Sequence, residues 1–134
     1  MSAYTLNLYV TIGLVVLIWL VQILQYPFFR YLDRENFLEA MLFHQNRITI
    51  IVMPLMAAEI IICILLTVLY PSLSTYLQMA LVTLIWLSTF FIQVPLHNQL
   101  LNGPNLDVIK KLTLSNWIRT GLWTLKLILL LTIF

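Results

Sequence analysis

Four long apolar stretches dominate the sequence, and each is long enough to cross a lipid bilayer as a helix. We place them at about residues 4–27, 48–70, 75–96 and 115–134, since roughly 20 apolar residues span the hydrocarbon layer. Hydrophobic residues make up 62% of the chain and charged residues 9%, whereas soluble domains carry about 25% charged residues. The sequence therefore predicts one all-α domain over residues 1–134, a polytopic bundle of four transmembrane helices with up-and-down topology.

The connection between the first two stretches, residues 30–47, has a different character. Its apolar residues Phe37 and Met41 recur at helical spacing, followed by His44, while charged residues occupy much of the rest. This pattern predicts a short amphipathic helix at the membrane surface, leading directly into the second span.

Basic residues are distributed unevenly between the two ends of the expected bundle. The two long connections and the start of the last span contain Arg30, Arg34, Arg47, Lys110, Lys111 and Arg119. The termini and the short turn near residue 72 contain no lysine or arginine. The positive-inside rule then puts both connections in the cytoplasm and both termini outside. No basic run is long enough to indicate a nucleic-acid partner.

Two charged residues fall deep within apolar stretches. Glu59 lies in the second stretch and Lys126 in the last, each roughly 14–18 Å from the expected start of its helix at about 1.5 Å per residue. An unpaired charge at that depth costs about 2.5–3.5 kcal/mol or more. We therefore predict that Glu59 and Lys126 form a buried ion pair. Such a pair serves either to fix the register of two helices or to support proton or ligand chemistry.

Most other polar residues of the spans lie toward the cytoplasmic end, which predicts a polar cup open to that side. Aromatic rings at intermediate depth, Trp123 among them, are suited to line a site for a flat apolar ligand. His97 or His44 would serve as general base, and Arg119 would hold a carbonyl or phenolate. The candidate binding residues of the cup are Gln22, Gln25, Gln93, Asn98, Asn116 and Trp123.

The two histidines also permit another interpretation. His44 and His97 would both lie at the cytoplasmic end and are able to ligate a haem or half-fill a metal site. Neither belongs to a recognisable metal motif, and no cofactor is firmly implied. Each histidine would otherwise cap a helix end at the membrane surface.

Several short motifs carry a family resemblance. The stretches V-P-L-H-N-Q-L from Val94 and N-W-I-R-T from Asn116 resemble those of small four-span membrane proteins of the anthrone-oxygenase-like group. Nearly the whole chain is similar to uncharacterised bacterial integral membrane proteins, which share Q-Y-P-x-F from Gln25, P-x-M-x-x-E from Pro54 and the N-W-I-R-T stretch. The first resemblance implies oxygenation of a fused aromatic polyketide, and the second implies a bacterial inner-membrane location without an activity.

These patterns together favour a membrane protein that binds or oxidises a flat aromatic or quinone-like molecule in the polar cup. One alternative is a non-catalytic subunit or assembly factor of a larger membrane complex, and another is a bis-histidine haem or metal protein. The expected partners are the lipid bilayer and a small hydrophobic ligand, with a homo-oligomer or larger complex left open. Whether the chain is an enzyme also stays open at this point.

Overall fold

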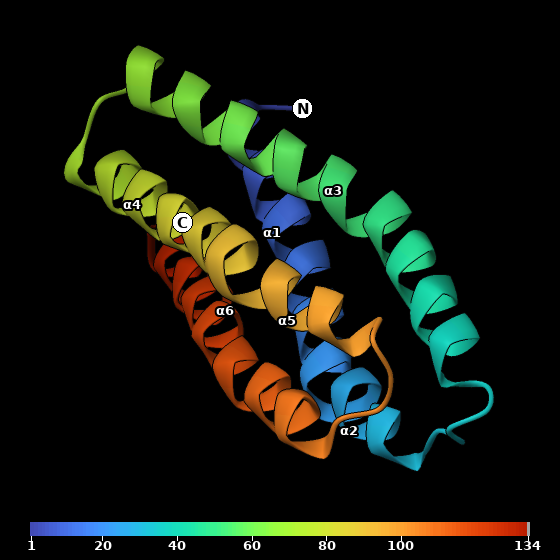
Figure 1. Cartoon of the computed structure of the whole chain (residues 1–134). Helices are drawn as coiled ribbons and strands as arrows, with labels where there is room; N and C mark the ends of the chain where they lie inside the picture. Colours follow the sequence, from blue (N-terminus) through green and yellow to red (C-terminus); the bar gives the residue numbers. More distant parts are fainter. Residues whose placement is uncertain (134) are drawn as a thin grey trace.

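The computed structural model describes residues 1–133, which are almost entirely helical and include no strand. Four helical rods lie side by side and alternate in direction along the chain, as Figure 1 shows. The first rod comprises α1 (Ala3–Leu20), the π-helical η1 (Val21–Gln25), α2 (Tyr26–Phe28) and the 3₁₀-helical η2 (Phe29–Tyr31). The remaining rods are α3 (Phe37–Leu69), then α4 (Leu73–Ser88) with the π-helical η3 (Thr89–Gln93) and α5 (Val94–Leu100), and finally α6 (Leu106–Ile133).

Three of the rods, Ala3–Tyr31, Phe37–Leu69 and Leu73–Leu100, are long and apolar enough to cross a membrane. The all-helical prediction is therefore confirmed, while α6 is not among these candidate spans and the count of four spans is not confirmed. Apolar side chains cover much of the outer surface, including Val16 at 55% and Val68 at 71% exposure. Charged residues lie inside the same bundle, an arrangement typical of a protein surrounded by lipid.

Two helix boundaries differ from the sequence-based prediction. The expected amphipathic helix is not a separate element, because its residues form the first turns of the 33-residue helix α3. Phe37 and Met41 are buried there rather than lying at a membrane surface. The last helix begins at Leu106 instead of near residue 115, since the Asn105 side chain caps it by accepting from the backbone N–H groups of Asp107 and Val108.

Widened turns interrupt the first and third rods at corresponding places. The π-helical segments η1 and η3 each end at a glutamine, Gln25 and Gln93, and a proline follows two residues later. Proline lacks an N–H and its ring collides with the carbonyl of the preceding turn, which explains the local widening. π-Helical turns often occur at functional sites because they shift side chains out of the α-helical phase.

The rods pack so that the backbones of α3 and α5 make few close contacts. Helix α3 packs against α1 and α4, while α6 packs against α1, α4 and α5. Apolar clusters occupy two levels of the bundle. One, around Phe37 and Leu112, lies at the end that carries the two long connections, here called the loop end, and the other, around Met56 and Ile85, lies in the middle. The polar groups described next lie between and beyond these clusters.

Candidate ligand cavity and its polar lining

A cavity of about 120 Å³ lies between the four rods, toward the end with the long connections. A comparable apolar cavity of about 150 Å³ in an engineered protein holds one benzene molecule, so this space suits a small flat ring. Its apolar wall consists of Leu14, Leu17, Ile18, Val21, Ile48, Val52, Met53, Met56 and Val94. Its polar and aromatic lining consists of Tyr26, His44, Thr49, Thr89, Gln93, His97, Arg119 and Trp123.

Arg119 is the charged residue of the cavity lining, and its guanidinium is held by three neutral groups. Nε donates to Asn116 Oδ1 at 2.9 Å, Nη1 donates to Thr89 Oγ1 at 3.2 Å and Nη2 donates to the Tyr26 hydroxyl at 3.2 Å. The Arg119 carbon Cζ also lies 6.0 Å from the centre of the Trp123 ring. The guanidinium is thus fixed in place at the cavity edge, with further N–H groups left for a ligand.

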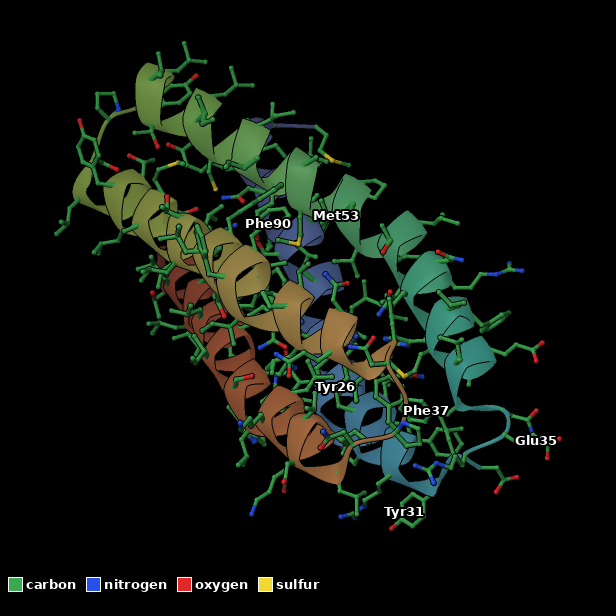
Figure 2. The ribbon with its side chains drawn as sticks, in the orientation of Figure 1. Tyr26, Tyr31, Glu35, Phe37, Met53 and Phe90 are labelled. Carbon is green, nitrogen blue, oxygen red and sulfur yellow. The ribbon has the colours of Figure 1, made fainter. Side chains whose placement is uncertain are left out.

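Tyr26 connects this guanidinium to His97. Its hydroxyl lies 2.9 Å from His97 Nε2 and accepts from Arg119 Nη2. The direction of the Tyr26–His97 bond follows the His97 tautomer, and we assign the Tyr26 proton to this bond, with His97 Nε2 accepting it. The neutral His97 ring then carries its own proton on Nδ1. Figure 2 shows Tyr26 between the helices, whereas Tyr31 and Glu35 point outward at the end of the bundle.

Two residues that line the cavity each have a side-chain atom that is buried without a hydrogen-bond partner. The two atoms are His97 Nδ1, which we assign as a donor, and Gln93 Oε1, which is an acceptor. Gln93 is 1% exposed, and its Nε2 donates to Ser115 Oγ at 3.0 Å. A buried polar group without a partner costs about 1–3 kcal/mol. A donor and an acceptor of this kind would together match a ligand hydroxyl, which accepts and donates at once.

His44 lies beside His97 on the cavity wall. The two ring centres are 5.7 Å apart and the ring planes are 17° from parallel. His44 also meets Phe29 edge to face, with 4.9 Å between ring centres. Both histidines predicted as general bases, together with Arg119, therefore line one cavity.

A second polar cluster lies deeper, around the predicted ion pair. Lys126 Nζ donates to Glu59 Oε2, to Asn7 Oδ1 and to Thr11 Oγ1, each at 3.0 Å. Glu59 and Lys126 are fully buried. Asn7 Nδ2 in turn donates to Gln78 Oε1 at 2.6 Å. The structure brings the two predicted partners together and surrounds them with polar groups from α1 and α4.

Trp123 joins the deep cluster to the cavity. Its Nε1 lies 3.1 Å from both carboxylate oxygens of Glu59 and donates to that carboxylate. The ring itself lines the cavity and is 1% exposed. Glu59 and Lys126 do not line the cavity, so they act on it only through the position of Trp123.

The remaining predicted binding residues divide into two groups. Gln22 and Asn116 are buried behind the cavity, where Asn116 Nδ2 donates to Gln22 Oε1 at 3.0 Å and Gln22 Nε2 donates to the Thr113 carbonyl at 2.8 Å. Asn116 accepts from the Arg119 guanidinium and is itself held by Gln22, and neither residue lines the cavity. Gln25 borders a separate surface hollow beside Phe28, and Asn98 is exposed. Gln22 and Gln25 both belong to the π-helical η1, where Gln22 is buried and Gln25 is not. Asn98 lies on the exposed side of α5.

Neither histidine belongs to a larger metal-binding group. Among the described residues, no three histidine, cysteine, aspartate or glutamate side chains come close enough to hold a metal ion. Met41, one residue able to complete a site with His44 through its sulfur, is fully buried in the apolar cluster at the loop end. The haem interpretation stays a prediction, and a visible absorption spectrum tests it.

Sequence reasoning missed several residues that line or support the site. Tyr26 was noted only as part of the Q-Y-P motif, and Thr89 carried no signal. Asn7 and Thr11 were missed as partners of Lys126, although Asn7 is an amide within an apolar stretch and so indicated a buried partner. No protein family model, curated protein or solved structure matches the chain. Its function is therefore inferred from this geometry.

Proposed function

We propose that this chain is an integral membrane protein that binds a flat hydrophobic molecule with a hydroxyl or carbonyl group. The observation that carries the proposal is the pair of partnerless atoms at the cavity wall, His97 Nδ1 and Gln93 Oε1. A ligand hydroxyl would accept from His97 and donate to Gln93, and a carbonyl would accept from His97. The hydroxyl would satisfy both groups, whereas the carbonyl would satisfy His97 alone.

The rest of the cavity suits the body of such a molecule. Leu14, Ile18 and Met56 present apolar side chains, and the Trp123 ring offers a flat surface. Burial of an aromatic ring among such residues stabilises the complex by about 25 cal/mol for each Å² of apolar surface removed from water. The polar group would then define which end of the ring points toward His97 and Arg119.

We further propose that α6 crosses the membrane as a fourth span. The charged side chains of Arg119 and Lys126 lower its mean hydropathy, yet both are buried against other helices. Its outward residues are apolar, including Leu125 and Ile128 at 52% exposure each. A helix with buried charges and an apolar outer face fits a lipid environment. The exposed bases Arg30, Arg34, Arg47, Lys110 and Lys111 lie at the loop end, which supports a cytoplasmic position for that end, with both termini outside.

The ligand would enter from the lipid phase between α3 and α5, whose backbones make few close contacts. The Gln45 side chain of α3 donates to the His97 carbonyl at 3.3 Å, so entry would pass beside this hydrogen bond. Two lining residues on these helices are exposed, Thr49 on α3 and Val94 on α5 at 39%. A hydrophobic molecule concentrated in the bilayer would reach the cavity by this route without crossing water. The location that best fits the resemblance is a bacterial inner membrane.

The resemblance to the anthrone-oxygenase-like group extends the proposal from binding to oxidation. It would make the ligand an aromatic polyketide and the reaction its oxygenation, with His97 or His44 as the base that removes a proton. Product analysis after incubation of the purified protein with a hydroxylated anthracene derivative in air tests this extension. Substrate consumption should then be lost in His97→Ala or in His44→Ala, according to which ring is the base, because both residues line the cavity.

The binding proposal is tested by filling the apolar wall without altering the polar groups. Val52→Phe places a ring in the cavity from α3, and Val68→Phe makes the same change on the outer surface of the same helix, where Val68 is 71% exposed. Phenol binding, followed by quenching of tryptophan fluorescence in detergent micelles, should weaken at least ~10-fold in Val52→Phe, which is about 1.4 kcal/mol. It should be unchanged in Val68→Phe. Equal binding by both variants would place the phenol elsewhere.

The rival interpretation, a subunit of a larger complex, is separated by native mass spectrometry. A small molecule retained by the purified chain supports the cavity. A stoichiometric partner protein with no small molecule would favour the subunit interpretation.

A further inference from the structure

The buried charges of the bundle do not balance. Three charged side chains are buried among the described residues, namely Glu59, Lys126 and Arg119. Glu59 and Lys126 form the ion pair that the structure records. Both oxygens of Glu59 are already engaged, since Oε2 accepts from Lys126 and both accept from Trp123. One buried positive charge, that of Arg119, is left without a counter-ion.

The surroundings of Arg119 do not supply the missing charge. Its three hydrogen-bond partners, from Asn116, Thr89 and Tyr26, are all neutral. The other acidic residues of the chain are Asp33, Glu35, Glu39 and Asp107, all of them exposed. An uncompensated charge inside a membrane protein costs several kcal/mol. Arg119 is only 7% exposed and lines the cavity, so the cavity is the place where a counter-charge would reach it.

We propose that the cavity binds its ligand as an anion, an ionised phenol or enol whose oxygen lies against Arg119. This inference rests on the proposed function and names the chemical class of the ligand. On binding, the O–H bond of the ligand breaks, the electron pair stays on oxygen and the proton passes to solvent. The oxygen then accepts from Arg119 and from His97 Nδ1–H, and a second hydroxyl on the ring would donate to Gln93 Oε1.

A carboxylic acid fits this arrangement less well than a phenol. A carboxylate has two acceptor oxygens and no donor, so Gln93 Oε1 would face a negative group and stay without a partner. A dihydroxylated ring that has lost one proton offers one acceptor oxygen and one donor. We therefore expect dihydroxylated rings to bind more tightly than monohydroxylated rings of the same size.

The titratable groups that face the cavity come from every helix around it. They are Tyr26 from the first rod, His44 from α3, His97 from α5 and Arg119 from α6. Glu59 and Lys126 lie behind Trp123. Because these groups titrate as well, the experiment reads the charge of the ligand directly and not only the pH dependence of its affinity.

The probe is para-nitrophenol, whose ionised form is yellow and whose neutral form is nearly colourless. A positive charge within about 4–6 Å shifts the ionisation of an acid by about 1–3 pH units. Burial of the ring opposes this shift because it disfavours the charged form, so the proposal requires the Arg119 charge to prevail. Bound para-nitrophenol should then be yellow at a pH below the value at which the free probe turns yellow. Arg119→Gln should remove the colour shift. Lys110→Gln, which removes a charge from an exposed position on the same helix, should leave it unchanged.

A second probe separates the failure of this inference from the failure of the proposed function. Para-nitroanisole has the same ring but no ionisable hydroxyl. If both probes bind equally well to the wild-type protein and bound para-nitrophenol stays colourless, the anionic ligand is excluded while the cavity remains a binding site. If neither probe binds, both proposals fall. These two readouts use the unaltered protein, so they decide between the outcomes even if Arg119→Gln does not fold. In addition, Arg119→Lys keeps the positive charge and should keep the yellow form of the bound probe.

Discussion

The two polar clusters of the bundle differ in how completely their hydrogen bonds are satisfied. In the deep cluster, the Lys126 ammonium has three acceptors and the Glu59 carboxylate accepts from two side chains. None of its buried side-chain atoms lacks a partner, and neither Glu59 nor Lys126 lines the cavity. At the cavity, His97 Nδ1 and Gln93 Oε1 have no partner and Arg119 has no counter-ion. The first cluster is complete within the chain, and on our proposal a ligand completes the second.

This difference separates a structural role from a functional one. A satisfied buried network resists rearrangement and fixes how helices pack, because any shift would leave polar groups unpaired. An unsatisfied network costs stability unless another molecule completes it. Substitutions in the deep cluster should therefore change stability first, and substitutions at the cavity should change ligand binding first. The predictions that follow test that division.

The largest effect is expected from breaking the deep ion pair. Lys126→Leu leaves the Glu59 carboxylate buried and unpaired, which should lower the free energy of unfolding by about 3–5 kcal/mol. Unfolding in mixed detergent micelles, followed by circular dichroism, measures this change. Lys110→Leu makes the same substitution at an exposed position of α6 and should alter stability little.

A double variant shows whether the loss comes from the stranded charge. In Glu59→Leu together with Lys126→Leu, no buried charge remains at this place, and most of the lost stability should return. If the double variant were as unstable as Lys126→Leu alone, the deep cluster would contribute through packing rather than through charge.

A smaller loss is expected at the bond between α1 and α4. Asn7→Leu removes an acceptor of Lys126 and leaves Gln78 Oε1 without its donor, at a cost of about 1–3 kcal/mol. Gln78→Leu should cost a similar amount. A double-mutant cycle measured by the same unfolding assay should show that the two losses are not additive, because both variants remove one shared hydrogen bond. Additive losses would mean that the 2.6 Å contact contributes no coupling.

The sequence predicted the deep cluster more fully than the cavity, and the reason is physical. A lone acid and a lone base in apolar stretches have few ways to avoid a large energetic cost, so their pairing follows from composition and approximate depth. Their neutral partners were less constrained. Asn7 and Thr11 were identifiable as polar residues in an apolar stretch, but the residue that each contacts depends on the rotation of α1 within the bundle.

The cavity depends on details that residue patterns do not contain. Its lining takes Val21 from η1 and both Thr89 and Gln93 from η3, and π-helical turns break the α-helical spacing used to assign faces. Tyr26 became part of the site because Pro27 follows a widened turn. Empty space between helices also depends on how side chains of different size meet, which no pattern in one chain specifies. The general location of the cup was predicted, and its lining was predicted only in part.

At the cavity, the hydroxyl of Tyr26 is the group to remove. Tyr26→Phe deletes the link between Arg119 and His97 and frees the His97 ring to change its protonated nitrogen. Phenol binding should weaken about 10-fold, corresponding to about 1.4 kcal/mol, while the free energy of unfolding falls by about 1 kcal/mol. Tyr31→Phe is the matched control, since Tyr31 is 70% exposed and lies outside the cavity. A loss of stability without any loss of phenol binding would mean that Tyr26 stabilises the fold and does not position a ligand-binding group.

The smallest effect is expected at Ser88, which tests whether a partnerless atom alone marks a ligand site. Its hydroxyl is buried without a hydrogen-bond partner, yet Ser88 does not line the cavity. Ser88→Ala removes an unsatisfied group, so stability should stay the same or rise by up to about 1 kcal/mol, and phenol binding should not change. Thr89→Val, at the next position, removes a hydroxyl that accepts from Arg119 and lines the cavity, and it should weaken binding. If both variants weakened phenol binding equally, the weakening would come from a general disturbance of the helix around Ser88 and Thr89. An unsatisfied polar atom would then not distinguish a ligand site from a structural position, and the contrast between the two clusters would carry no functional meaning.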